Sequence, residues 1–254
     1  MAFDRGMIIV GCCGWAVKGG KKCYYSRFGA IEVQQTFYRL PKVETMERWR
    51  SESPENFTFT IKAWQVITHP STSPTWGRAR THIKGKLGNY GFLKPTVENL
   101  AAWDNVLEIY RALRADACIL QCPPSFEPSS KNVANAKGFF KLIDKEGIRV
   151  GVELRGRWKA KPELASEICE EFGLIHVVDP FRWKCVSKSE LAYYRLHGIG
   201  GEDVNYAYKY TYDDLKDLRS YVLEKKAKKV YVFFNNISMS QDAYRFKKMI
   251  NEVC

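Results

Sequence analysis

Charged residues stand at the ends of several short apolar runs in this sequence, where they could bind an anion or transfer a proton. In residues 150–155 (VGVELR), Val152 and Leu154 fall on one face of an extended strand and Glu153 and Arg155 on the other, because successive strand residues point to opposite faces. Lys, Glu and Arg are seldom buried unless they are paired, so this pattern predicts mutual ion pairs or a bound ligand. The same alternation selects one set of residues: Glu32, Lys62, Glu153, Arg155, Asp179, Arg195 and His197.

The chemistry of these side chains indicates their roles. Arg155 and Arg195 are expected to bind an anionic part of the substrate, because a guanidinium pairs bidentately with phosphate or carboxylate. The other five residues, Glu32, Lys62, Glu153, Asp179 and His197, are candidate catalytic residues. The carboxylates could serve as general bases or as ligands of a single divalent cation. His197 could transfer a proton near neutral pH, and Lys62 could also bind an anion. Further substrate contacts are expected from Trp15, Tyr38, Gln121, Trp158 and Asn235. The alternative is that the charges form a purely structural ion-pair network and that the aromatic rings pack in the core.

Alternating strand and helix patterns surround these residues and must position them. In residues 98–113, Leu100, Val106, Leu107 and Tyr110 recur at helical spacing. Predicted strands cover 7–13, 30–36, 57–62, 115–121, 148–155, 174–179, 192–197 and 229–235, and predicted helices cover 43–51, 98–113, 132–146, 162–172, 213–225 and 240–253. Strand alternating with helix implies parallel pairing, and about eight such units close a barrel. We therefore expect residues 1–254 to form a single (β/α)₈ TIM-type barrel of the α/β class, with the charged residues at its C-terminal mouth; the alternative is a doubly wound open sheet.

Two connections in the predicted barrel are longer than the rest. Residues 14–28 follow the first strand and are rich in Lys, Gly and Tyr, and residues 64–95 follow the third strand and include His69, Trp76, Arg80 and His82. Long connections in a compact domain are usually lids, binding loops or disordered segments, and loops that follow a strand lie on the catalytic face of a barrel. Their mixture of basic and aromatic side chains suits a phosphate backbone with bases stacked beside it.

The charge balance indicates an anionic partner. The chain has 40 Lys and Arg against 28 Asp and Glu, a net charge of +12, and such an excess raises the local concentration of anions, so an anionic substrate is expected, RNA and DNA included. No apolar run approaches the roughly 20 residues that cross a bilayer, and the short charged start lacks the layout of a signal peptide. We therefore expect a cytoplasmic protein without a membrane partner. We assume that it is a monomer. Eight cysteines without a C-x-x-C pair, and only four histidines, argue against a structural zinc or a multi-zinc site.

Several segments resemble those of a known family. They are VG and GW at 10–15, IEV and TFYRLP at 31–41, FTIKA and TH at 59–69, QCPPSF at 121–126, VELR with Trp158, YRLHG at 194–198 and VYVFFNN at 230–236. In these segments, which span nearly the whole chain, the protein resembles the YecE-like family, known as domain of unknown function 72. The resemblance implies a TIM barrel similar to xylose isomerase and endonuclease IV, without naming a reaction. The chain departs from the family pattern with Cys12-Cys13 in place of the usual Thr-Ser and with Gln34-Gln35 in place of Asn-Ser, so substrate contacts from the first loop are not transferred.

Three functions are open at this point. The first is an enzyme, of the hydrolase or lyase type, that acts on a nucleic-acid or phosphate-containing substrate at the barrel mouth; the basic charge and loops favour it. The second is a small-molecule isomerase or lyase acting on a sugar or sugar phosphate, which rests on fold analogy and which a narrow pocket would favour. The third is a nucleic-acid-binding protein without chemistry, which the basic and aromatic loop favours and the inward-pointing charges oppose.

Overall fold

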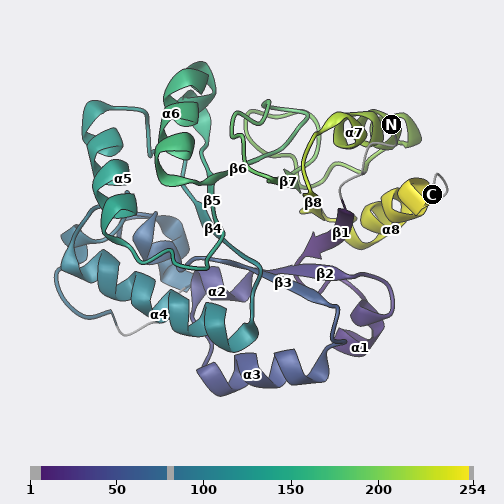
Figure 1. The fold of residues 1–254 in the computed structure, drawn as a ribbon, viewed down its shortest axis with the longest axis horizontal. Coiled ribbons are helices and arrows are strands. Elements are labelled where there is room, and N and C mark those ends of the chain that lie inside the picture. The colour runs from purple at the N-terminus through teal and green to yellow at the C-terminus, as the bar shows by residue number, and fades with distance from the viewer. Residues whose placement is uncertain (1–6, 79–82, 252–254) are drawn as a thin grey trace.

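Eight parallel strands close a barrel in the computed structural model, which describes residues 7–78 and 83–251. Each strand pairs with the next along the chain, and β8 pairs with β1 (Figure 1). The strands are β1 (Met7–Cys13), β2 (Ala30–Val33), β3 (Thr58–Lys62), β4 (Ala117–Gln121), β5 (Val150–Glu153), β6 (Ile175–Val178), β7 (Leu191–Leu196) and β8 (Lys229–Phe234). The predicted TIM-type barrel is confirmed, and the open sheet is excluded because the sheet has no edge strand.

Helices outside the strands form the crossovers between parallel neighbours (Figure 1), except between β6 and β7, whose connection of residues 179–190 contains no helix. They are α1 (Gly20–Tyr25), α2 (Gln35–Tyr38), α3 (Val43–Glu52), α4 (Val97–Leu113), α5 (Ser130–Leu142), α6 (Pro162–Phe172), α7 (Tyr212–Glu224) and α8 (Met239–Asn251). Three of them begin after a residue whose side chain accepts a hydrogen bond from the backbone three residues on, namely Thr96, Ser129 and Thr211. Helix α6 begins with Pro162 and ends before Gly173 in the left-handed conformation, as its sequence predicted.

The middle of the barrel is filled by apolar side chains. The rings of Tyr231 and Phe233 stack with centroids 5.6 Å apart, and Tyr193 packs against both. Strand β1 approaches β2 closely at this level, since a Cβ on Gly11 would lie 2.3 Å from the carbonyl oxygen of Ala30. The barrel is therefore a packed core rather than a channel, and a ligand can reach it only from its ends.

An exposed ion cluster marks the N-terminal end of the barrel. The carboxylate of Asp116 pairs with Arg149 at 2.8 Å and with Lys229 at 3.3 Å, and it accepts a hydrogen bond from Tyr231 at 2.9 Å. The Arg149 side chain is 55% exposed, so water screens this cluster. The ion pairs at the other end of the barrel differ, because they are buried.

The two long connections are more ordered than their sequences predicted. Residues 14–28 contain α1, and residues 64–95 contain three short 3₁₀ helices, η1 (Gln65–Ile67), η2 (Pro74–Arg78) and η3 (Leu87–Asn89). Strand β2 is also shorter than predicted: Thr36 lies in α2, where its hydroxyl is 3.0 Å from the carbonyl oxygen of Val33 and 2.7 Å from that of Lys62. Arg80 and His82 lie outside the described residues. In the part of the chain that the structure describes, no helix combines the length and the apolar character needed to cross a membrane.

Candidate active site

Arg195 is the centre of a buried ion-pair network at the C-terminal end of the barrel. It lies on β7 with its side chain fully buried, and its Nε donates to Oε1 of Glu32 on β2 at 3.1 Å. Its Nη1 donates to the carboxylate of Glu153 on β5 and, at 3.0 Å, to Oε1 of Gln121 on β4. One guanidinium thus joins four strands across the barrel, and its burial requires these partners.

The network continues from Glu153 to the end of β7. Nε of Arg155 donates to Oε1 of Glu153 at 2.6 Å, and Nη2 of Arg155 donates to Nε2 of His197 at 3.2 Å. A nitrogen that accepts from a guanidinium carries no proton, so the proton of neutral His197 is on Nδ1, which lies 3.7 Å from Oδ2 of Asp179. The same Asp179 oxygen accepts the backbone N–H of His197 at 2.8 Å, which fixes the position of the residue that carries the imidazole.

These contacts set the charges of the network. Burial by itself would raise the pKa of Glu153, but the positive charges of Arg155 and Arg195 outweigh burial and hold its pKa well below the usual range. Burial lowers the pKa of His197, although Glu153 and Asp179 oppose that shift. Near neutral pH, Glu153 is therefore ionised and His197 neutral, a state in which His197 can accept a proton.

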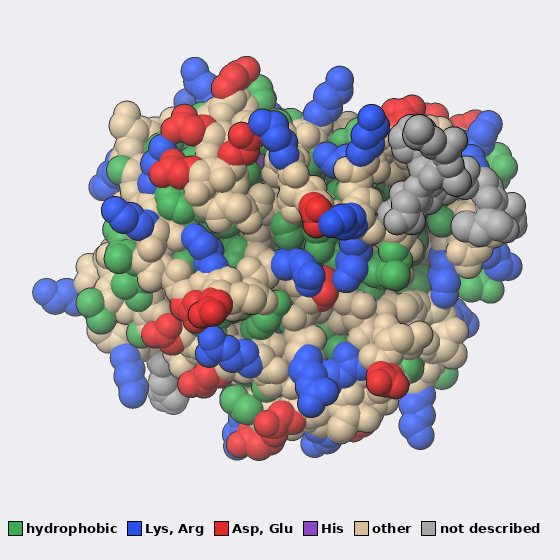
Figure 2. Space-filling model, viewed as in Figure 1, with side chains coloured by type: hydrophobic (Ala, Val, Ile, Leu, Met, Phe, Trp, Pro, Cys, Tyr) green, Lys and Arg blue, Asp and Glu red, His purple; other side chains and the backbone are tan. Residues whose placement is uncertain are grey.

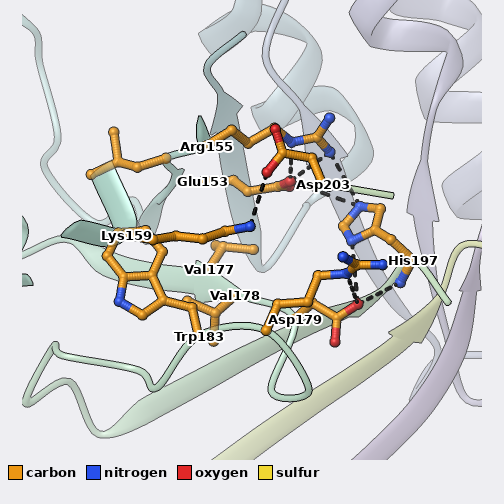
Figure 3. A pocket seen from close by; sticks show the side chains of 11 residues that line it. Glu153, Arg155, Lys159, Val177, Val178, Asp179, Trp183, His197 and Asp203 are labelled. Carbon is orange, nitrogen blue, oxygen red and sulfur yellow. Dashed lines mark hydrogen bonds and ion pairs between the residues drawn. The ribbon is translucent and has the colours of Figure 1, made fainter. Parts of the chain in front are cut away.

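A pocket lies beside the part of the network that contains Glu153, Arg155, Asp179 and His197 (Figure 3). Figure 3 shows Lys159 reaching across to Asp203, and the two side chains form an ion pair of 2.9 Å between the loops that follow β5 and β7. The residues around the pocket are Glu153, Leu154, Arg155, Lys159, Val177, Val178, Asp179, Arg182, Trp183, His197 and Asp203. Its volume is about 30 Å³, enough for one or two water molecules.

Lys62 is the last residue of β3 and also lies at the mouth of the barrel. Its side chain is 4% exposed, and its Nζ lies 3.7 Å from the centre of the Phe37 ring. The Phe37 ring packs edge-on against His69, with centroids 5.0 Å apart. Burial and the charge of Arg195 lower the pKa of Lys62 from 10.5 to about 7, against the opposing effect of the carboxylates. Burial, together with Lys62 and Arg155, lowers the pKa of His69 to about 3, so His69 is neutral.

Comparison with known proteins identifies the family. The family model described as "Protein of unknown function DUF72" matches residues 9–253. The chain belongs to the DUF72 family. It is 25% identical to the UPF0759 protein YunF of Bacillus subtilis (strain 168), over 96% of this chain and 94% of that protein. The resemblance to the domain of unknown function 72 that the sequence motifs indicated is thus confirmed.

Solved structures support the same fold. A DUF72 family protein of Thermotoga maritima MSB8 has 23% sequence identity and a TM-score of 0.73, and the match covers 96% of this chain and 99% of that one. A D-psicose 3-epimerase, crystallised in the presence of D-fructose, has 11% identity and a TM-score of 0.53 over 91% of both chains. At such low identity these likenesses show the barrel and carry no reaction over to this DUF72 protein.

The structure brings most of the predicted site residues of this DUF72 protein together. The seven charged or titratable residues selected by strand alternation all lie at the mouth of the barrel, in the network or beside it, and Gln121 contacts Arg195. Asn235 follows β8 and is half-buried, and its backbone N–H donates to the carbonyl oxygen of Leu196. The catalytic and substrate-binding roles of these residues stay predictions.

Two of the predicted aromatic contacts lie away from the pocket. Trp158 is fully buried and stacks on Phe126, to whose carbonyl oxygen its indole N–H donates. Trp15 packs edge-on in an aromatic cluster between the strands and the helices. The other members of this cluster are Tyr24, Tyr25, Trp49 and Phe59. Both residues therefore belong to the packing of the fold rather than to the wall of the pocket. Half-buried Tyr38 contacts the edge of the Phe37 ring, so it stays a candidate at the rim.

Three residues that lie at the site were not assigned to it from the sequence. Phe37 is the ring under the Lys62 amine, whereas the sequence predicted a substrate contact at its neighbour Tyr38. Tyr193 donates its hydroxyl to Oε2 of Glu32 at 2.7 Å and lies 2.7 Å from the hydroxyl of Thr60; its place two residues before Arg195 was the available signal. His69 was noted in the long loop but not assigned to the site.

The carboxylates at the mouth do not fit a metal site. Glu32 and Glu153 both face the guanidinium of Arg195, which occupies the position a cation would take. In residues 7–78 and 83–251, no group of three or more His, Cys, Asp and Glu side chains could hold a metal ion. The single divalent cation allowed by the sequence therefore has no set of ligands among these residues.

Proposed function

We propose that this DUF72 protein is an enzyme that acts on a small anionic substrate, phosphorylated compounds included, at the C-terminal mouth of its barrel. The observation that carries this proposal is the state of Lys62. Its amine is buried at the mouth, and no carboxylate of the described residues lies within ion-pair distance of it. A lysine kept partly neutral by burial is a typical catalytic base or nucleophile.

The surroundings of Lys62 provide the other parts of an active site. His197 is a neutral imidazole and is the candidate general base of the site. The lowered pKa values of Glu153 and His69 make these two groups weak bases near neutral pH. The guanidiniums of Arg155 and Arg182 and the amine of Lys159 line the pocket and can bind the anionic group of a substrate. In this proposal the substrate enters when the Lys159–Asp203 pair separates.

The size of the pocket favours a small substrate over a polynucleotide. The pocket between the loops has a volume of about 30 Å³ and must widen for any substrate, but it must widen less for a small anion than for a nucleotide strand, which needs an open groove with stacking surfaces. On the face seen in Figure 2, the Lys and Arg side chains are interspersed with Asp and Glu. The net charge of +12 still favours anions in general.

Thermal unfolding with candidate ligands tests this proposal. The panel contains phosphorylated and unphosphorylated sugars of two to six carbons and a 20-nucleotide single strand of DNA and of RNA in a salt series. A ligand at a hundred times its Kd stabilises by about 2.7 kcal/mol, which raises the Tm by roughly 5 °C or more for a chain of this size. We expect this rise with at least one phosphorylated sugar.

The neighbouring residue Arg157 offers a matched control. Arg155 lies in the network, whereas the Arg157 side chain is 79% exposed. Arg155→Gln should abolish the rise in Tm, and Arg157→Gln should retain it. Salt-dependent stabilisation by the nucleic acids, with none by the small anions, would overturn the proposal in favour of nucleic-acid binding.

A further inference from the structure

Lys62 differs from the other cations at the mouth in forming no direct ion pair with a described residue. Arg155 and Arg195 pair with Glu153, Arg182 lies 3.7 Å from Asp179, and Lys159 pairs with Asp203. Among the described residues, no carboxylate lies within 4 Å of the Lys62 amine, which is placed over the Phe37 ring instead. An amine that were present only to balance charge or to close the barrel would be expected to have a partner, as the other four cations do.

The charged groups that face Lys62 come from several elements and act in opposite directions. Burial and the guanidiniums of Arg195 and Arg155 disfavour its protonation, whereas Glu32 and Glu153 favour it. The first two effects prevail, and the pKa of Lys62 falls to about 7. The neighbouring His69 is neutral. A large share of Lys62 is therefore the free amine near neutral pH, which is the nucleophilic form.

We propose that Lys62 is the nucleophile that forms a Schiff base with the carbonyl carbon of a small anionic aldehyde or ketone. This inference rests on the proposed function and specifies its substrate class. The anionic group would occupy the pocket beside Arg155 and Lys159, which line it together with Arg182. Lys62 does not line this pocket itself, so the carbonyl group would have to extend from the pocket toward β3, where Lys62 ends the strand.

The chemistry of this step is balanced without a further reactant. The nitrogen lone pair of Lys62 attacks the carbonyl carbon, the C–O π electrons move to the oxygen, and a proton passes from nitrogen to that oxygen to give a carbinolamine. The C–O bond then breaks, and uptake of one proton releases the oxygen as water and leaves a protonated imine. Nothing is oxidised or reduced. The cationic nitrogen withdraws electrons from the neighbouring carbon, which suits the isomerase and lyase reactions considered from the sequence.

Reductive trapping on the full-length protein tests this inference. The probe is glycolaldehyde phosphate at pH 7.5 with sodium cyanoborohydride, followed by digestion and mass spectrometry of each lysine. With a pKa near 7 instead of 10.5, the neutral fraction of Lys62 is larger by a factor of several hundred. We expect Lys62 to be labelled at least about tenfold faster than exposed Lys141 on α5, and inorganic phosphate to slow the labelling by competing for the pocket.

Two variants and one second readout separate the outcomes. Lys62→Arg should lose the trapped adduct at this position, and Lys141→Arg should leave trapping at Lys62 unchanged. If phosphorylated sugars raise the Tm but Lys62 is labelled no faster than Lys141, the Schiff base is overturned and the small-anion enzyme stands. If no small anion raises the Tm and no selective adduct forms, the proposed function and this inference both fail.

Discussion

Replacing Lys62 by methionine tests the physical basis of the proposed site, because it removes the amine and keeps the length of the side chain. The pKa of Lys62 is lowered from 10.5 to about 7 in the folded protein, and at about 1.4 kcal/mol per pH unit this difference corresponds to roughly 5 kcal/mol. A lowered folded-state pKa contributes stability that is fully present above the unfolded value, 10.5, and is lost as the pH falls through the folded value, about 7. The wild-type protein should therefore gain stability between pH 7 and 10.5, and Lys62→Met should not share that gain.

Urea unfolding at pH 6, 7, 8 and 9 measures this effect. We expect Lys62→Met to be more stable than the wild type at pH 6, and its advantage to shrink by about 3 kcal/mol by pH 9, a shift of roughly 1 M or more in the urea midpoint difference. The control is Lys141→Met, whose exposed side chain on α5 should give a difference from the wild type that does not vary with pH. A Lys62→Met difference that is equally flat from pH 6 to 9 would refute the reasoning, since the buried amine would then keep its ordinary pKa.

Three further substitutions separate the network from the packing around it. Arg195→Met should cost about 3–5 kcal/mol in urea unfolding, because it leaves buried carboxylates without their central cation; a cost below 1 kcal/mol would contradict the network. Trp158→Phe should cost about 1–2 kcal/mol by losing the hydrogen bond to the carbonyl oxygen of Phe126, and it should leave the rise in Tm with phosphorylated sugars unchanged. Gly198→Ala should give little folded protein on size-exclusion chromatography, because φ is +84° and the new Cβ would lie 2.0 Å from the carbonyl oxygen of Asn205.

The alternation of strand residues was enough to place most of the charged site. In β5 and β7 the period of two is a local property of the chain, so the sides of Glu153, Arg155 and Arg195 could be inferred from their neighbours alone. The partners could not be inferred in the same way. That Glu32 meets Arg195 depends on the closure of the barrel, which leaves only β1 and β8 between β2 and β7. That Lys62 meets no carboxylate among the described residues depends on the same geometry.

Aromatic residues and short helices were harder to place. A tryptophan after a strand can face the pocket or the helices, and the sequence around Trp158 does not show that Phe126, 32 positions earlier, stacks on it. The helix α2 has four residues, too few to show a helical period, so Thr36 was assigned to the preceding strand. That error also hid Phe37, which the turn into α2 places under the Lys62 amine.

The contrast between the network and Lys62 explains why both belong to one site. In the network each guanidinium has a carboxylate and each carboxylate has a guanidinium, so its members hold one another in place, and such networks rigidify the groups they contain. Lys62 differs from the network, since its buried amine lies over the Phe37 ring and forms no ion pair with a carboxylate of the described residues. Side chains that violate the local rules of folding are expected at functional positions. The stability that the protein loses by keeping this amine is therefore understandable if the rigid network orients a substrate and Lys62 reacts with it.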